Sequence, residues 1–434
     1  MRKENAMSAS YERSMISDTI GYTSVVDPKF KTNTIKIRFI LPLSPEKASA
    51  YALASSMLTT SCRKYPSIAA LNRKMNRLYG GTSVMDVSKL GDFQIITATF
   101  AAICNSYALE NEDILGELLD VMKDCIFDPD VRDEGFSPVE FAIKKKDLLD
   151  TIDAEINNKR GYAVRQCARL AYKDELSSYS CYGEREDVEK ITPQQAYTAY
   201  KEMLETAAVE VFFVGVERQP SVPVKIGEAF AGISRRASGM PLFVNPSPLK
   251  TEIAEKTEVM DVAQCKMVMA FKSDSDDLYA MLLMNMLYGV TPFSMLFTNV
   301  REKLSLCYYC ASSYSETKRT MFVDCGVEKA NIQTARDEII RQLEAVAAGE
   351  FSDEVLENTR LSVYNSIKGI GDSPSSYIRW YFNQTVRREN NSAEDLMNIY
   401  ASIDRERIMN AAKSLKLDSV YVMESSGKEE AENE

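Results

Sequence analysis

Residues 34–58 read TIKIRFILPLSPEKASAYALASSML, and residues 264–287 read QCKMVMAFKSDSDDLYAMLLMNML. Each stretch begins with apolar residues at every second position, which indicates a strand. A polar turn follows, and then a second apolar stretch with the length of a helix. Ser44-Pro45-Glu46 is expected to cap the first helix, with the proline at its first position. Ser275-Asp276-Asp277 is expected to cap and charge the second helix.

The two halves of the chain continue in parallel. A pair of alternating strands is expected in Tyr79–Ala101, around a Gly-Asp turn, and another pair in Leu306–Glu328. Two helices then follow in each half, near Asn111–Cys125 and Ser137–Ile156 in the first and near Asn331–Ala348 and Ser352–Ile367 in the second. Each half closes with another helix and a strand. We infer an internal duplication.

The duplication predicts an α+β fold of two tandem similar domains. Each domain is expected to hold a mixed, mainly antiparallel sheet with helices. The first domain is expected in residues 1–216 and the second in residues 252–426. Residues 217–251 are rich in proline and glycine, which is typical of an inter-domain linker. Residues 427–434 are acidic and are expected to be a disordered tail.

The composition of the 434-residue chain is typical of a globular protein, with 45% hydrophobic and 26% charged residues. The net charge of −11 argues against a nucleic-acid partner, because phosphates attract clustered Lys and Arg. The apolar run Tyr279–Val290 is too short to cross a bilayer. The first residues lack the apolar segment of a signal peptide. We therefore expect a cytoplasmic protein without a membrane partner.

The chain contains no histidine. The usual general base and the commonest metal ligand are therefore missing, which excludes a Ser-His-Asp triad or a His-based zinc site. Nine cysteines are an odd number in a large chain, so no disulfide framework is expected. Cys307 and Cys310 form the only C-x-x-C motif, and regular strand geometry would place them on opposite faces. We expect neither a metal nor another cofactor.

The second half carries a recognisable motif. GVTPFSMLFTNVREKLSLCYYCASS, at Gly289–Ser313, resembles the C-terminal signature of the insulinase-like (pitrilysin) zinc metallopeptidases, which include the mitochondrial processing peptidases. In the first half, NRLYGGTSVMDVSK is similar to another turn of that family, and Gln264 matches a further position. Ser305 departs from the signature, which has glycine there. The matching positions are Ser294, Leu296, Phe297, Val300, Arg301, Glu302, Lys303, Leu306 and Tyr308. The resemblance covers nearly the whole chain and implies the LuxS/insulinase-like metallopeptidase fold.

The family's zinc motif is absent. Active members carry His-x-x-Glu-His on the first long helix, where both histidines bind zinc and the glutamate polarises water. Alignment with this sequence places the two histidine positions at Ala52 and Ser56 and the glutamate position at Ser55. The third ligand of the family is a glutamate on a later helix, and the nearest matches are Asp150 or Thr151. The resemblance therefore implies an inactive homologue without a metal.

Two other family positions are retained. The resemblance implies that Arg301 and Tyr308 bind substrate, because the family's arginine and tyrosine at these positions reach a peptide held near zinc. A guanidinium and a phenol can both donate hydrogen bonds to a peptide carbonyl. The structural interpretation is an arginine paired with a core carboxylate and a tyrosine packed in the sheet.

Three functions remain compatible with these residues. The first is a bacterial non-catalytic subunit that pairs with an active zinc-containing homologue, as a heterodimer, to process peptides. The second is a purely structural or peptide-binding subunit of an assembly or homo-oligomer. The third is an independent serine or cysteine hydrolase with a lysine base, which no spacing of residues supports. In each case we expect the chain by itself not to be a metallopeptidase.

Overall fold

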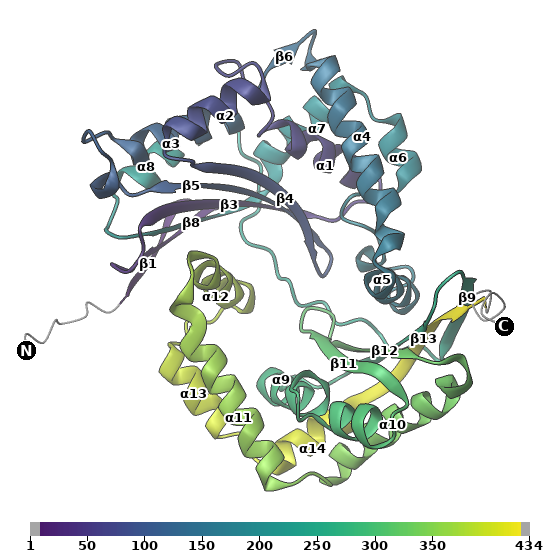
Figure 1. The fold of residues 1–434 in the computed structure, drawn as a ribbon. Helices are drawn as coiled ribbons and strands as arrows, with labels where there is room; N and C mark the ends of the chain where they lie inside the picture. The colour runs from purple at the N-terminus through teal and green to yellow at the C-terminus, as the bar shows by residue number, and fades with distance from the viewer. Residues whose placement is uncertain (1–8, 427–434) are drawn as a thin grey trace, which may run out of the picture. The chain divides into compact units, whose positions relative to one another are not determined.

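The computed structural model describes residues 9–426, and the predicted acidic tail at 427–434 lies outside them. The chain forms two compact units, each assembled from separate segments (Figure 1). Unit 1 comprises the chain up to Asp153, Tyr179–Phe243 and Gly371–Arg388. Unit 2 comprises Ala154–Ser178, Val244–Ile370 and the chain from Glu389 onward. The predicted linker stretch contains a regular helix, Ser221–Phe230.

Unit 1 is built on a six-stranded sheet in the order β1-β2-β8-β3-β5-β4. The β2–β8 pair is parallel, and the other neighbours are antiparallel. The strands are β1 (Ser10–Ser17), β2 (Ile20–Val26), β3 (Thr32–Pro42), β4 (Thr82–Leu90), β5 (Phe93–Ile103) and β8 (Ala208–Gly215). A short hairpin of β6 (Val131–Arg132) and β7 (Gly135–Phe136) stands apart from this sheet.

Unit 2 is built on a five-stranded sheet in the order β11-β12-β10-β13-β9. The β13–β9 pair is parallel, and the other neighbours are antiparallel. The strands are β9 (Ala254–Met260), β10 (Cys265–Ser273), β11 (Cys307–Ser315), β12 (Thr320–Val327) and β13 (Leu415–Ser425). Read from β9, this order repeats that of unit 1 from β2 onward, including the position of the parallel pair. The predicted duplicated α+β fold with mixed, mainly antiparallel sheets is confirmed.

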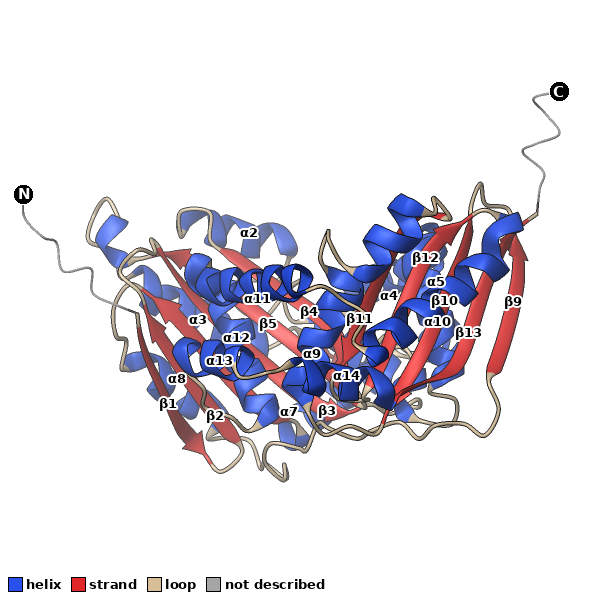
Figure 2. Ribbon diagram, turned by 90° about the horizontal axis from the view of Figure 1, so that it is seen from below, coloured by secondary structure: helices blue, strands red, loops and turns tan. Residues whose placement is uncertain are grey.

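The helices of unit 1 cover its sheet on both faces (Figure 2). They are α1 (Ala48–Met57), α2 (Ile68–Arg77), α3 (Ile114–Phe127), α4 (Pro138–Ala154), α6 (Arg185–Lys190), α7 (Pro193–Thr206), α8 (Ser221–Phe230) and α12 (Pro374–Arg387). The largest core joins one face of the sheet to α1, α3, α7 and α8. Its strand residues alternate along the chain, as in Ile35, Ile37 and Phe39, because every second side chain of a strand points to the same face.

Unit 2 follows the same plan. Its helices are α5 (Lys159–Ala171), α9 (Leu278–Asn285), α10 (Ile332–Ala348), α11 (Asp353–Lys368), α13 (Ala393–Ala401) and α14 (Arg405–Ser414). Two short π-helical segments, Met286–Val290 and Leu296–Lys303, join α9 to β11. Asp277 caps α9 by accepting from the Ala280 amide, as predicted. The predicted cap at Ser44 is wrong, because residues 44–47 form a turn and α1 begins at Ala48 after Lys47.

Helix α12 belongs to the second half of the sequence but packs in unit 1. Its residues Ile378, Phe382 and Val386 are buried in a core with Phe212 of β8. The Arg38 guanidinium of β3 lies 3.9 Å from the centroid of the Phe382 ring. Burial lowers the pKa of Arg38 to about 10. The apolar side of α12 is therefore part of the unit 1 core.

Helix α5 shows the reciprocal arrangement, because it belongs to the first half of the sequence and packs in unit 2. Ala163, Cys167 and Ala171 lie every fourth residue along α5, so they share one face of the helix. This face is buried against residues of β10, β12 and β13. The strand residues are Val268, Ala270, Phe322, Tyr421 and Met423. A helix from the first half thus completes the core of the second sheet.

A buried group of charges lies at the C-terminal end of α5. The ammonium groups of Lys250 and Lys272 donate to the carbonyl oxygen of Ala171 at 2.7 and 2.8 Å. The same two ammonium groups lie 2.8 and 3.1 Å from the carboxylate of Asp418 on β13. The last carbonyls of a helix have no partner within it, so the lysines satisfy one of them. The cluster ties α5, the segment around Lys250 and the sheet together.

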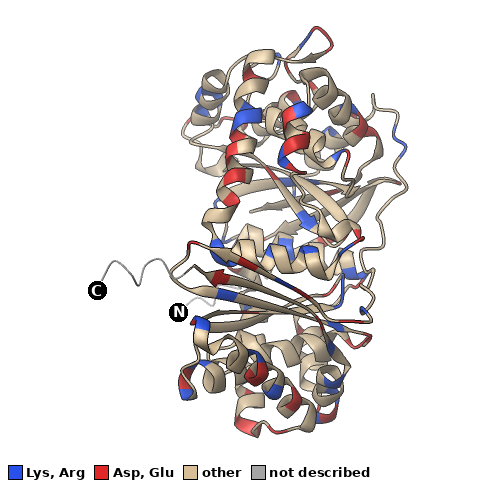
Figure 3. Ribbon diagram, turned by 90° about the vertical axis from the view of Figure 1, so that its right-hand side faces the viewer, with Lys and Arg blue, Asp and Glu red and all other residues tan. Residues whose placement is uncertain are grey.

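Charged residues of both signs are interspersed along the helices in the view of Figure 3, which is typical of solvated helix faces. Within residues 9–426, every helix is too short or too polar to cross a lipid bilayer.

We expect Asp418→Asn to lower the free energy of unfolding by about 3–5 kcal/mol, because it leaves buried ammonium groups without their carboxylate. Burial by itself would raise the pKa of Asp418, but its bonds to Lys250 and Ser419 lower the pKa overall. The folded-state pKa is thus below the unfolded one. This stabilisation is present above the unfolded pKa and is lost as the pH falls through the folded pKa.

Urea denaturation at several pH values measures this effect. The control is Glu424→Gln on the same strand, whose partner Lys329 is largely exposed. Loss of an exposed ion pair costs at most about 1 kcal/mol. Equal stabilities of Asp418→Asn and Glu424→Gln would contradict the proposed importance of the cluster.

Candidate functional site

Helix α1 stands where the resemblance places the catalytic helix, and nine of its ten residues are buried. A helix that is apolar on every side belongs inside a core. The side-chain amide of Gln94 fixes its first turn by donating to the carbonyls of Ala48 at 3.1 Å and Cys181 at 2.6 Å. Lys47, just before the helix, forms an ion pair with Glu202 of α7 at 2.6 Å.

The start of α1 is covered by the backbone of Gly183. This glycine has a φ of 75°, and a Cβ added to it would lie 1.8 Å from the Ser49 hydroxyl oxygen. Only glycine combines that conformation with so close an approach. The covering loop is therefore built to pack against α1.

The three positions that the resemblance aligns with the family's zinc motif carry no group that suits zinc. Ala52 is 4% exposed and Ser55 is 1% exposed. The hydroxyl of Ser55 donates to the Ala52 carbonyl at 2.8 Å, and that of Ser56 donates to the Leu53 carbonyl at 2.7 Å. Both serines therefore satisfy their hydrogen-bonding capacity within the helix. Zinc requires imidazole, thiolate or carboxylate ligands, so these residues do not fit the metal.

The positions matched to the family's third zinc ligand also form no metal site. Asp150 and Thr151 are exposed on α4, and the Thr151 hydroxyl donates to the Asp147 carbonyl at 2.8 Å. Across the described part of the chain, residues 9–426, no cluster of three or more Cys, Asp or Glu side chains is arranged to hold a metal ion.

Arg301 and Tyr308 are brought together at the start of β11 by a β-bulge. In the ladder with β12, Cys307 pairs with Val327 and Tyr309 already pairs with Gly326, so Tyr308 is the extra residue. Its carbonyl accepts from Arg301 Nε at 3.0 Å, and its side chain is 66% exposed. The bulge thus explains both the exposure of the phenol and its closeness to the guanidinium.

The guanidinium of Arg301 is held at a second point, because it lies 4.6 Å from the centroid of the Phe297 ring. No carboxylate within residues 9–426 forms an ion pair with Arg301, which is exposed. The structure therefore differs from the structural interpretation, which placed the arginine against a core carboxylate and the tyrosine inside the sheet. Both side chains are free to meet a ligand.

Ser305 has a φ of 52° in the turn before β11. This left-handed conformation costs most residues roughly 1–2 kcal/mol and costs glycine almost nothing. The position where the family signature has glycine is thus one where the backbone favours glycine, and the turn is kept here with serine.

The bulge also corrects the prediction for Cys307 and Cys310. They were expected on opposite faces of a regular strand, but the extra residue between them places both thiols in the buried layer. Interaction with the neighbouring Cys310 thiol lowers the pKa of Cys307. All nine cysteines are free thiols.

Sequence patterns also missed the buried charges. Lys272 lies within β10 and Asp418 within β13. A lysine or aspartate inside a buried strand requires a partner of opposite charge, so their presence in apolar stretches could have indicated a buried ion pair. Their pairing depends on residues 146 positions apart and could not be read from local periodicity.

These features define a duplicated α+β protein in which helix α1, at the position that the resemblance gives to a catalytic helix, is a packing element. Residues 190–363 match the family model described as Peptidase M16 inactive domain. The chain is 26% identical over 420 residues to a Bacillus subtilis (strain 168) protein described as "Probable inactive metalloprotease YmfF", which covers 95% of this chain and 98% of that protein.

Solved structures share the fold. A conserved protein from Enterococcus faecalis V583 has a TM-score of 0.89 and 23% identity, covering 96% of this chain and 99% of that one. A structure described as a peptidase M16 inactive domain from Pseudomonas fluorescens has a TM-score of 0.79 and 13% identity, covering 96% and 98%. Residues 190–363 thus match an M16 inactive domain, and the chain shares its fold with a structure described in the same terms, in agreement with the predicted insulinase-like family. The similarity to proteins described as inactive supports the prediction that the chain by itself is not a metallopeptidase.

We expect the variant with Ala52→His, Ser55→Glu and Ser56→His to bind zinc only weakly. The first two changes insert large polar groups into a packed core, and overpacking alone costs about 1–3 kcal/mol. The hydrogen bonds that orient ligating imidazoles would also be missing. Elemental analysis should show well under one zinc per chain, with a lowered melting temperature.

The control is Ser56→His alone, at a position that is only partly buried. It should change the melting temperature little. A triple variant that binds one zinc per chain at an unchanged melting temperature would show that the helix remains a usable metal site.

Proposed function

We propose that this protein is the non-catalytic subunit of a peptide-processing pair. Its partner is a homologue with an intact zinc motif, and this chain supplies a peptide-binding surface. The observation that carries the proposal is the contrast between two places in the chain. Helix α1 has no metal-binding group, whereas Arg301 and Tyr308 are exposed side by side and held in position.

The chemistry of Arg301 and Tyr308 suits a peptide. A guanidinium presents several donors in a planar fork, and a phenol presents one more. Because the Nε of Arg301 is engaged by the Tyr308 carbonyl, the outer nitrogens remain for a peptide carbonyl or carboxylate. Donors that are already oriented lose little entropy when a ligand binds.

A second feature supports peptide binding. Strand β4 lies at the edge of the unit 1 sheet, with β5 on one side only. Its residues Thr82, Val84, Asp86 and Ser88 are exposed. An edge strand can pair with an extended peptide through main-chain hydrogen bonds, which gives affinity with little dependence on sequence.

We also propose that the pair works in the cytoplasm of a bacterial cell. Nine free thiols in one chain suit a reducing compartment, because oxidising compartments favour disulfides.

Affinity purification of the tagged chain from its native cell tests the pairing. An intact zinc-containing homologue should be recovered in a one-to-one ratio. Peptide hydrolysis should require both chains and should stop on addition of a chelator, because only the partner can supply a zinc-bound hydroxide. Cleavage by the lone purified chain, or recovery of the chain solely as a homo-oligomer, would contradict the pairing.

We expect Arg301→Ala to lower the kcat/KM of the reconstituted pair about ten- to hundredfold. A hydrogen bond to a charged group is worth roughly 1.5–3 kcal/mol, and about 1.4 kcal/mol corresponds to a factor of ten. Tyr308→Phe removes a single hydroxyl and should cost less. Neither change should lower the melting temperature appreciably, since both side chains are exposed.

Lys303→Ala is the matched control, because Lys303 lies on the same π-helical segment, is exposed, and bonds to Asn299. It should leave activity unchanged. Full activity of both Arg301→Ala and Tyr308→Phe would favour a purely structural subunit instead.

A further inference from the structure

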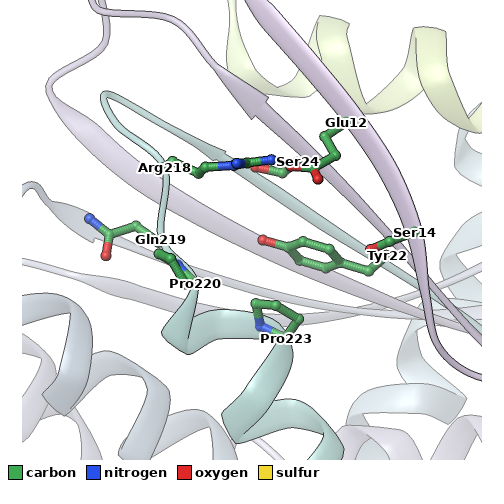
Figure 4. A pocket seen from close by; sticks show the side chains of 8 residues that line it. All are labelled: Glu12, Ser14, Tyr22, Ser24, Arg218, Gln219, Pro220 and Pro223. Atoms are coloured by element: carbon green, nitrogen blue, oxygen red, sulfur yellow. Dashed lines mark hydrogen bonds and ion pairs between the residues drawn. The ribbon is translucent and has the colours of Figure 1, made fainter.

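Unit 1 contains a pocket of about 250 Å³ near the free edge of its sheet (Figure 4). The floor comes from β1 and β2, and the other side from the segment after β8 and the first turn of α8. No residue discussed above as part of the peptide site lines it.

The floor of the pocket is polar and partly buried. In the β1–β2 ladder, Glu12 lies opposite Ser24 and Ser14 lies opposite Tyr22, so these four side chains share one face. Tyr22 and Ser24 are buried. Burial raises the pKa of Tyr22 to about 12, so the phenol stays protonated at neutral pH and can donate.

The rim of the pocket carries one charge of each sign. The guanidinium of Arg218 forms an ion pair with the carboxylate of Glu12. Both side chains are at least half exposed, and an exposed ion pair contributes at most about 1 kcal/mol. The two charges can therefore separate at little cost to meet opposite charges on a ligand.

The remaining wall is apolar. Pro220 and Pro223 line the pocket beside the ring of Tyr22, with the amide of Gln219 at the edge. Prolines lose almost no side-chain entropy on binding, so they form a preorganised surface for a small apolar group.

We propose that this pocket binds a small zwitterion, namely a free amino acid or dipeptide with an apolar side chain. The ligand's ammonium group faces Glu12, its carboxylate faces Arg218, and its side chain lies against the two prolines. A lone anion or cation is disfavoured, because each meets one rim charge of its own sign. A neutral sugar gains from neither charge.

The site stands independently of the proposed peptide site, since it uses residues of unit 1 only and neither Arg301 nor Tyr308. Its ligands belong to the class of compounds that peptide hydrolysis releases.

Saturation-transfer NMR and isothermal titration calorimetry with the full chain test the proposal. The probes are L-leucine and glycyl-L-leucine, compared with N-acetyl-L-leucine, L-leucine amide, glucose and inorganic phosphate. The two zwitterions should bind saturably, and the two blocked leucines should bind about tenfold more weakly, because each lacks one charged contact. Absence of zwitterion binding, or equal binding of glucose or phosphate, would overturn the proposal.

Variants locate the binding. Arg218→Gln and Glu12→Gln should each weaken L-leucine binding about tenfold, with unchanged melting temperatures. The control is Arg236→Gln. Arg236 is 66% exposed and paired with Glu205, which closely matches Arg218, 68% exposed and paired with Glu12. Arg236→Gln should leave binding unchanged. Equal effects of all three changes, or no effect of the first two, would place the ligand elsewhere and overturn the assignment.

Discussion

Each sheet of this protein has two apolar faces, and each half of the chain covers only one of them with its own helices. The second face is covered by a helix from the other half: α12 in unit 1 and α5 in unit 2. Apolar area removed from water is worth roughly 25 cal/mol per Å², so an uncovered sheet face would be strongly destabilising. The exchange of helices therefore makes each unit dependent on both halves of the sequence.

Each exchanged helix is held in place by a different set of contacts. In unit 2 the C-terminal end of α5 is fixed by the buried charges at Ala171, where Lys250 and Lys272 share a carbonyl and the carboxylate of Asp418. In unit 1, the matching helix is held by aromatic contacts, including the Phe382 ring against the Arg38 guanidinium. The two equivalent elements thus reach the same packing by different chemistry, as expected of halves that have diverged since duplication.

The candidate functional site contrasts two places in the chain. Helix α1 lies in the core, and Ala52, Ser55 and Ser56, the positions that the resemblance aligns with the family's zinc motif, pack and bond within the helix. At β11 a bulge exposes Tyr308, and Arg301 donates to the Tyr308 carbonyl. The contrast between a helix without metal-binding groups and the exposed Arg301 and Tyr308 is the basis for proposing a subunit that holds peptides rather than one that cuts them.

The sequence by itself determined the duplication, the type of each main element and the absence of any histidine ligand for zinc. Alternating and helical periodicities are local, and a ligand such as histidine that is missing from the chain cannot be supplied by folding. The sequence also identified Arg301 and Tyr308 as candidates, but only through a resemblance. The tertiary structure decided the exchange of α5 and α12, the bulge that turns Cys307 and Cys310 to one face, and the pocket between Glu12 and Arg218. Each of these depends on contacts between strands or segments far apart in the chain, and local periodicity carries no information about which distant residues will meet.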